Sequence, residues 1–319
     1  MGGDPSRGLH RFAVMTAIAC FVLVVAGALV TSNDAGLSVP DWPLSHGSLL
    51  PNMVGGIFYE HSHRLIAATV GLLTIVLAFW LQKSEPRSWI RRIGWLALGM
   101  VVAQGVLGGI AVLFFLPTSV SVAHACLGQI FFCLLVTLAY LTSPSGQGDY
   151  SLLHRSRARP GLDRQTKMAS LTVLVIFVQL MLGAILRHTG TVGGSKGATL
   201  VTSALLAHLF WALVVGGFVV ATAFAVLGRP GAASSNRLGY LMVFLFGLQL
   251  LLGLGAYWAR VVHLQQAQPL LSGVVITTCH VAVGALLLAG SLILSLSLAQ
   301  QTESGDALLD LHESKGFSS

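Results

Sequence analysis

Residues 104–128 read QGVLGGIAVLFFLPTSVSVAHACLG. The end of one apolar segment, with Gln104 and Gly108, leads through a turn at Pro117 into a second apolar segment that carries His124 and, four residues later, Gly128. The same order of glutamine, glycine, turn and histidine recurs along the chain. This unit predicts a repeated hairpin of two helices, and the repeats decide the fold.

Four histidines occupy equivalent positions in successive hairpins, and each is followed four residues later by a small residue. The pairs are His63 and Ala67, His124 and Gly128, His208 and Ala212, and His280 and Gly284. Three of the preceding segments carry Gln-x-x-Leu-Gly: Gln104 to Gly108, Gln179 to Gly183, and Gln249 to Gly253. The first segment has only a degenerate version around Ala26 and Gly27. We expect the glycines to let helices approach closely and the glutamines to hydrogen bond between helices.

The composition is that of a membrane protein. Hydrophobic residues make up 55% of the chain and charged residues 9%, and the mean hydropathy is +0.81. These values exclude a soluble core as the main architecture. Apolar stretches of spanning length lie at 11–31, 60–82, 93–115, 118–142, 167–187, 200–227, 237–258 and 273–299. The fold class that we predict is therefore all-α, with eight transmembrane helices in two pseudo-symmetric four-helix bundles.

The repeats also predict the domain organisation. Residues 1–142 form an N-terminal four-helix half and residues 167–299 a C-terminal one, related by a pseudo-two-fold axis along the membrane normal. The basic segment 143–166 is expected to be a cytoplasmic connector. The polar tail 300–319 is expected to be disordered and cytoplasmic.

The net charge of +7 is explained by membrane orientation. Lysine and arginine gather at the N-terminus and in alternate loops, at 83–92, 155–167 and 229–237. By the positive-inside rule these loops and both termini lie in the cytoplasm. The outer loop 32–59 contains Asp34 and Asp41 but no lysine or arginine. No nucleic-acid partner is expected, and the bilayer is the predicted surrounding.

The four repeated histidines, His63, His124, His208 and His280, are candidate ligands of haem iron. Coordinating side chains inside a bilayer are rare and are a functional signal by default. Imidazole is a common axial ligand of haem, and two imidazoles from facing helices can hold one haem. Four ligands in register therefore predict two haem sites. The alternative is a set of unrelated polar positions in a transporter or a scaffold.

Glu60 breaks the symmetry of the repeat. It lies three residues before His63 and shares a helix face with it. The equivalent positions in the other hairpins are Ser121, Leu205 and Thr277. A carboxylate beside one site is suited to general acid–base chemistry. The alternative is a carboxylate that stabilises the N-terminus of its helix.

Three arginines depart from the positive-inside trend. Arg64, Arg187 and Arg260 lie at the predicted outer ends of helices, near the depth of the histidines. Arginine pairs well with carboxylates and so is suited to the haem propionates. The alternative is contact with lipid headgroups, and Arg64 is equally suited to pair with Glu60.

Two motifs and the later histidines resemble a known family. Residues 35–43 read AGLSVPDWP, and Glu60, His63 and Arg64 follow in the pattern Glu-x-x-His-Arg. Together with His124, His208 and His280, this combination resembles the haem A synthases over essentially all eight predicted helices. One departure is that loop 32–59 contains no cysteine, whereas many bacterial members carry a cysteine pair there. The resemblance is therefore to a subtype without that pair.

The resemblance implies an oxidoreductase that converts the C8 methyl group of haem O to a formyl group, giving haem A for terminal oxidases. It implies that His63 and His124 flank the substrate haem O, with Glu60 as a catalytic carboxylate. It further implies that His208 and His280 ligate a resident haem b. The implied location is the inner membrane of a bacterial cell. The candidate partners are haem O synthase, an electron acceptor and a second copy of the chain.

Two other functions fit the residues themselves. A cytochrome b with two histidine ligands per haem would exchange electrons with quinone and modify no haem, although Glu60 and the inequality of the halves speak against it. A transporter would show proline-broken helices at the midplane, and no proline lies within the predicted spans. The four cysteines all fall within predicted spans and are interpreted as small buried side chains.

Overall fold

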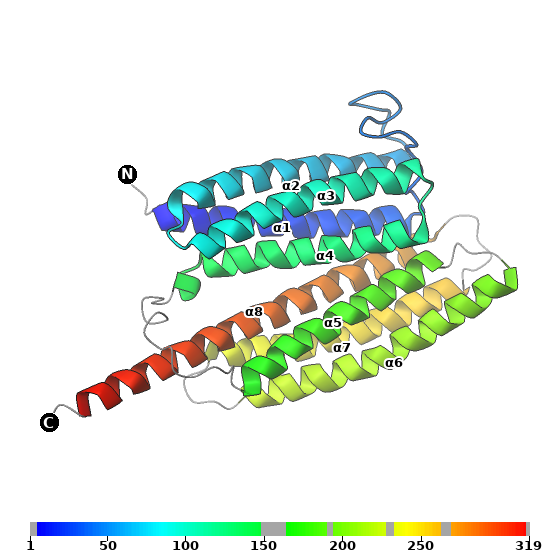
Figure 1. The fold of residues 1–319 in the computed structure, drawn as a ribbon. Coiled ribbons are helices and arrows are strands. Elements are labelled where there is room, and N and C mark those ends of the chain that lie inside the picture. The colour runs from blue at the N-terminus through cyan, green and yellow to red at the C-terminus, as the bar shows by residue number, and fades with distance from the viewer. Residues whose placement is uncertain (1–4, 148–163, 190–193, 228–232, 263–268, 317–319) are drawn as a thin grey trace.

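Figure 1 shows the chain as a computed structural model made of two layers of long helices. The structure describes residues 5–147, 164–189, 194–227, 233–262 and 269–316; within these ranges, the side chains of 5–6, 147, 194–197, 233, 260–262 and 302–316 are not described. In these ranges there are eight α-helices: α1 Pro5–Ser32, α2 Gly56–Ser84, α3 Ser88–Leu113, α4 Thr118–Leu141, α5 Arg164–Thr189, α6 Gly194–Val226, α7 Ala233–Val262 and α8 Leu271–Gly316. A single 3-10 turn, Ser145–Gln147, follows α4.

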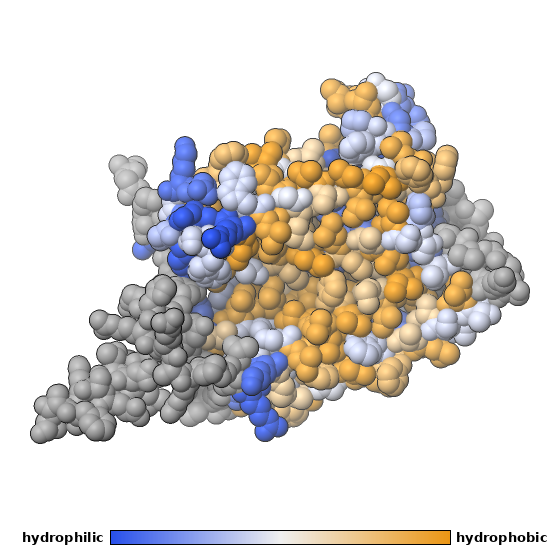
Figure 2. Space-filling view, in the orientation of Figure 1, coloured by the Kyte–Doolittle hydropathy of each residue, from blue (hydrophilic) through white to orange (hydrophobic). Residues whose placement is uncertain are grey.

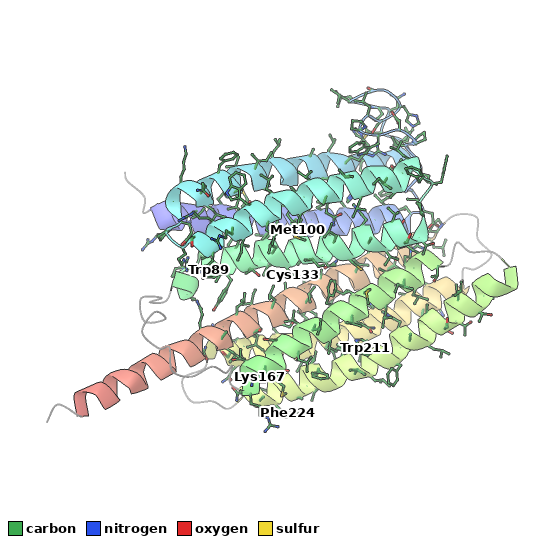
Figure 3. All side chains as sticks on the ribbon, in the orientation of Figure 1. Trp89, Met100, Cys133, Lys167, Trp211 and Phe224 are labelled. Carbon is green, nitrogen blue, oxygen red and sulfur yellow. The ribbon has the colours of Figure 1, made fainter. Side chains whose placement is uncertain are left out.

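All eight α-helices are long and apolar enough to cross a membrane. Helices are suited to the lipid core because each backbone N–H and C=O group forms its hydrogen bond within the helix and needs no water. Apolar side chains cover the middle of the bundle in Figure 2, and hydrophilic ones gather toward its two ends. In Figure 3, Trp89 and Lys167 lie at the end where both termini are found, whereas Met100 and Cys133 lie midway along their helices. The predicted all-α membrane fold is confirmed.

Each half is a closed ring of four helices. In the N-terminal half α1 packs on α2 and α4, and α3 packs on α2 and α4. The C-terminal half repeats this pattern, with α5 packing on α6 and α8, and α7 packing on α6 and α8. Figure 1 shows α1–α4 as one layer and α5–α8 as the other. Two pseudo-equivalent four-helix halves are therefore present, as the repeats predict.

The first and last helices of each half form the interface between the halves. Contacts run between α1 and α8, between α4 and α5, and between α4 and α8. Ala285 and Ala289 of α8 belong to the same buried cluster as Leu77 and Leu135 of the N-terminal half. The last helix therefore completes the core of the first half.

The connection between α3 and α4 shows how the chain turns within one hairpin. Phe115 and Leu116 both have positive φ angles, of 58° and 57°. Pro117 caps the N-terminus of α4, where its fixed φ and missing N–H are tolerated. The turn brings Gln104 and His124 to facing helices.

The end of the chain differs from the sequence prediction. The sequence predicts disorder from residue 300, whereas α8 continues as a helix to Gly316. Alanine, leucine, glutamine and glutamate in this stretch are good helix formers, and the preceding membrane span removes the cost of starting a new helix. Most of the predicted connector 143–166 lies outside the described residues.

Candidate haem sites and the outer-loop network

Each repeated histidine packs against a glycine of the preceding helix. A Cβ atom added to Gly27 would lie 3.1 Å from Cε1 of His63, and one added to Gly108 would lie 3.3 Å from Cε1 of His124. The C-terminal half repeats the contact at 3.1 Å for two pairs, Gly183 with His208 and Gly253 with His280. The expectation that these glycines permit close approach is confirmed, and the group brought close is the imidazole itself.

The two histidines of the C-terminal half face each other across the bundle. The ring centroids of His208 and His280 are 6.4 Å apart, and their planes are inclined by 68°. A metal–imidazole bond of ~2 Å on each side, added to the radius of each ring, puts two axial imidazoles ~6 Å apart. The separation therefore matches that of two axial ligands of one iron.

The two histidines of the N-terminal half are also neighbours. His63 and His124 lie near enough for their charges to interact. His63 comes from α2 and His124 from α4, helices that do not pack directly on each other but share α1 and α3 as neighbours. Both halves thus direct two histidines from opposite helices of a ring toward its middle.

The nitrogen atoms of the four histidines fit the haem hypothesis. In the described part of the chain, Nδ1 of His63, His124, His208 and His280 is buried and has no hydrogen-bond partner. Buried polar atoms are normally paired, so four equivalent exceptions call for a ligand. Among the described residues no group of three or more His, Cys, Asp or Glu side chains could hold a bare metal ion. A haem needs only two protein ligands, because the porphyrin supplies the other four.

The glutamines of the repeat bridge to the histidine-bearing helices, as the sequence predicts. Nε2 of Gln104 donates to the backbone carbonyl of His124 at 3.0 Å. Nε2 of Gln179 donates to the backbone carbonyl of His208 at 3.1 Å. The small residue after the histidine makes room for the amide, since a Cβ on Gly128 would lie 3.1 Å from Nε2 of Gln104.

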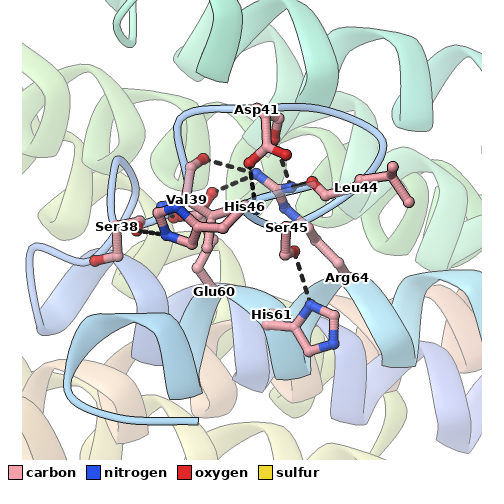
Figure 4. A network of polar contacts seen from close by, with 9 residues as sticks. All are labelled: Ser38, Val39, Asp41, Leu44, Ser45, His46, Glu60, His61 and Arg64. Carbon is pink, nitrogen blue, oxygen red and sulfur yellow. Dashed lines mark hydrogen bonds and ion pairs between the residues drawn. The ribbon is translucent and has the colours of Figure 1, made fainter. Parts of the chain in front are cut away.

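Glu60 is buried, with only 3% of its surface exposed, and it faces the outer loop. Its Oε2 accepts a hydrogen bond from the backbone N–H of Val39 at 2.8 Å. Its Oε1 forms an ion pair with Arg64 at 2.7 Å. Figure 4 shows this network of Glu60, Arg64 and the loop above them. Of the three partners considered for Arg64, Glu60 is therefore the one that it contacts in this structure.

Arg64 also fastens the backbone of the outer loop. Its guanidinium donates to the carbonyl oxygens of Asp41, Leu44 and Val39 at 2.7, 2.7 and 3.0 Å. The neighbouring His61 contacts the loop as well, with its Nδ1 2.8 Å from Oγ of Ser45. His61 therefore faces the outer loop.

Asp41 closes a tight turn within the same loop. Its two carboxylate oxygens accept hydrogen bonds from the backbone N–H groups of His46 and Gly47, both at 2.7 Å. Both turn residues have positive φ angles, of 52° and 69°. The N–H of Gly47, and then that of His46, hold the pKa of Asp41 below its ordinary value of 3.8 because they stabilise the carboxylate.

The remaining predicted arginines lie at the outer ends of α5 and α7. Arg187 of α5 forms an ion pair with Asp34 at 2.8 Å and donates to the carbonyl oxygen of Thr31. It therefore joins the C-terminal half to the end of α1, a contact that sequence reasoning missed. Arg260 lies in α7, and its side chain is outside the described residues.

Two further links between the halves lie at the same outer end. Thr277 of α8 donates to Oγ of Ser32 in α1 at 2.9 Å. Thr118 of α4 donates to the carbonyl oxygen of His188 in α5 at 3.3 Å. The two contacts are pseudo-equivalent, since each joins the start of an even helix to the end of an odd one.

The sequence pattern of the cytochrome oxidase assembly protein family, COX15-CtaA, matches residues 10–196, more than half of the chain. The chain belongs to this family. The matched residues extend from α1 to the beginning of α6, so they include the outer-loop network and both histidines of the N-terminal half.

Similar proteins carry the name heme A synthase. The protein from Symbiobacterium thermophilum is 28% identical over 76% of this chain and 74% of its own length. The protein from Bacillus licheniformis is 30% identical over 58% of this chain and 61% of its own length. That from Shouchella clausii is 27% identical over 60% of this chain. The latter two matches span less than two thirds of those relatives, 61% and 63%.

Proposed function

We propose that the chain is a haem A synthase, an oxidoreductase that converts haem O to haem A. Family membership and the names of the relatives support this activity. The observation that carries it to particular residues is the pair of histidines in each half, each packed on a glycine and each with a buried nitrogen that lacks a partner. One half then holds the substrate and the other a permanent haem.

The C-terminal half is the proposed site of the resident haem b. The rings of His208 and His280 face each other, and these two side chains would hold the haem iron. When bound there, haem b supplies a one-electron acceptor within the same chain. The pseudo-equivalent pair, His63 and His124, then holds substrate haem O, with its reactive methyl group fixed by the rigid helical ring.

The proposed reaction requires the N-terminal half to pass on both electrons and protons. Oxidising a methyl group to a formyl group removes four electrons and four protons and introduces one oxygen atom, by hydroxylation and loss of water from the gem-diol. A carboxylate near the reacting carbon can receive such protons. We assign this role to Glu60, which is buried one helical turn from His63.

The hydrogen bonds around Glu60 support this role because they fix the position of its carboxylate. The N–H of Val39 and the guanidinium of Arg64 each occupy one carboxylate oxygen, so the side chain is held in one orientation. Charge-assisted hydrogen bonds of this kind are short and directional. Arg64 at the same time holds the loop over this end of the half, which would limit access of water to the site.

The proposed location is a bacterial inner membrane, with both termini in the cytoplasm and loop 33–55 outside. The asymmetry of lysine and arginine supports this orientation. In a variant without native cysteines, Ser48→Cys should react with an impermeant maleimide in intact cells, whereas Ser84→Cys at the other end of α2 should react only after lysis. The reverse pattern would invert the orientation.

Pigment analysis of the purified protein tests the function. The protein should contain haem b together with haem O, haem A or a partly oxidised intermediate, and it should convert added haem O to haem A in membranes. Haem B as the only pigment, at two per chain and without conversion of haem O, would instead identify a cytochrome b.

A further inference from the structure

The two glutamines of the C-terminal half, Gln179 and Gln249, contact the imidazole rings of their hairpins. Nε2 of Gln179 lies 3.3 Å from Nε2 of His208. Nε2 of Gln249 lies 3.4 Å from Nε2 of His280. Both histidines of the C-terminal half thus face an amide with one ring nitrogen and leave the other ring nitrogen without a partner.

The side-chain amides of these glutamines also have an acceptor atom that makes no hydrogen bond. In the described residues, Oε1 of Gln104, Gln179 and Gln249 is buried without a hydrogen-bond partner. Leaving a buried acceptor unpaired is unfavourable, because the group loses its hydrogen bonds to water and gains none in the protein. A histidine that binds iron through one nitrogen carries a proton on the other and needs an acceptor for it. Half a turn of the amide exchanges Oε1 and Nε2. Oε1 would then accept from the ring nitrogen, in exchange for the bond that Nε2 of Gln104 or Gln179 donates to the backbone carbonyl of its histidine.

The first hairpin has no glutamine amide at this position. His63 packs on Gly27 as closely as the other histidines pack on their glycines. The position four residues before Gly27, where the other three helices have glutamine, is Leu23. The side chain of leucine can neither donate to a ring nor accept from it. His63 therefore contacts only the backbone of Leu23, a backbone contact that the other three histidines also make with their glutamines. Among the four ligand candidates, His63 alone is therefore paired with a helix that has no amide at this position.

We propose that Gln104, Gln179 and Gln249 are positioning residues for the haem ligands of their hairpins, and that Leu23 leaves His63 as the weakly held ligand from which the substrate haem exchanges. This inference rests on the proposed function. The resident haem has two supported ligands, and the substrate haem has one. The difference gives one half a permanent haem and the other a replaceable one.

The first test concerns release of haem b from the C-terminal half. Gln179→Leu and Gln249→Leu each install the residue that the chain itself uses in α1. Loss of such an outer partner typically weakens a metal site ~10–100-fold, so transfer of haem b from the purified variants to apomyoglobin should accelerate by that factor. Unchanged transfer in both variants would overturn the proposal.

Gln165→Leu is the matched control. Gln165 also lies in α5 and donates to a backbone carbonyl of α6, that of Ala225, at 2.8 Å. Its Oε1 is likewise buried without a partner, but it does not contact a histidine ligand in any described hydrogen bond. It should leave the rate of haem release unchanged. An equal acceleration in this variant would show that only helix packing is involved, and would also overturn the proposal.

The reduction potential of haem b separates positioning from packing. An acceptor on the distal ring nitrogen makes the ligand more basic and favours ferric iron. Gln179→Leu should therefore raise the potential, and Gln179→Glu, which offers a stronger acceptor, should lower it. Shifts in the same direction for both variants would contradict the proposed hydrogen bond.

The reverse change tests the N-terminal half. With haem B loaded in both halves, Leu23→Gln should slow release of the second haem equivalent by ~10-fold or more and leave the first unaffected. Equal release from Leu23→Gln and wild type would refute the role of Leu23. None of these measurements uses conversion of haem O, so an inactive wild-type protein would refute the proposed function and leave them decisive for the glutamines.

Discussion

The two halves of this protein are built from the same hairpin unit but differ at their outer ends. In both, a histidine packs so closely on a glycine that a Cβ atom added to the glycine would lie 3.1–3.3 Å from the imidazole ring, and each half is a closed ring of helices. In the part of the chain that the structure describes, only the N-terminal half has the Glu60–Arg64 pair and the loop held above it, and this half has Leu23 in place of glutamine. On the proposed function, the common unit holds a haem in each half, and the differences place the chemistry and the exchange of haem in the N-terminal half.

The strongest test of this comparison is to remove one ligand from each half. His208→Ala or His280→Ala should abolish the low-spin haem b spectrum of the purified protein, because the iron loses one of its two protein ligands. His63→Ala should keep that spectrum and lose haem A formation. Retention of full haem b content in both C-terminal variants would reverse the assignment of the halves.

The next effect concerns Glu60, which has no acidic equivalent in the other three hairpins. Glu60→Gln should lower conversion of haem O by ~10²-fold or more if it acts in proton transfer, with haem b content unchanged. Haem O or a partly oxidised intermediate should accumulate in extracts analysed by chromatography.

Ser121→Ala is the control for Glu60→Gln, because Ser121 holds the equivalent position before His124 and is also buried. It should convert haem O at a near-normal rate. Normal haem A formation by Glu60→Gln would show that Glu60 only holds the outer loop in place and takes no part in the reaction.

A smaller effect is expected from filling the glycine cradle of the C-terminal half. A methyl group on Gly183 would press on the ring of His208 at 3.1 Å, and overpacking of this kind costs ~1–3 kcal/mol. Gly183→Ala should therefore weaken haem b binding by ~5–150-fold, as measured by titration of the protein stripped of haem. Gly217→Ala in α6, whose added Cβ meets nothing within 4 Å, should bind haem b normally. Equal affinity of the two variants for haem b would show that Gly183 does not contribute to the haem site.

The smallest effect belongs to the outer loop. Because the pKa of Asp41 is lowered in the folded protein, its ionised form stabilises the turn above the ordinary value of 3.8, and this contribution is lost as the pH falls through the lower, folded value. Protection of the His46 and Gly47 amides from hydrogen exchange should fall over that range in wild type. Asp41→Asn should show weaker protection without this pH dependence, whereas Asp34→Asn should behave like wild type. Persistence of the pH dependence in Asp41→Asn would assign it to another group.

Much of the fold was accessible from the sequence because lipid imposes simple rules. Spanning length, hydropathy and the recurring His and Gly positions predict eight helices in two halves, as the structure confirms. The close approach of Gly108 to His124 also follows from the motif. The Glu60–Arg64 pair could be anticipated because the two residues are one helical turn apart.

The rest depended on contacts that sequence spacing does not encode. The carbonyl oxygens of Val39, Asp41 and Leu44 converge on Arg64 only because an irregular loop folds back over α2. Arg187 reaches Asp34 across 153 residues of chain, so no local pattern marks the pair. The buried, unpaired amide oxygens of the glutamines become visible only when the neighbouring helices are in place.

The packing of α8 on α1 and α4 has a consequence for how the protein is made. Ala285 and Ala289 complete the buried cluster of the N-terminal half, yet they are the last part of that cluster to leave the ribosome. Until α8 is inserted, the first four helices present an unfilled face to the lipid. A nascent chain therefore cannot complete the core of its N-terminal half until the final span has been synthesised.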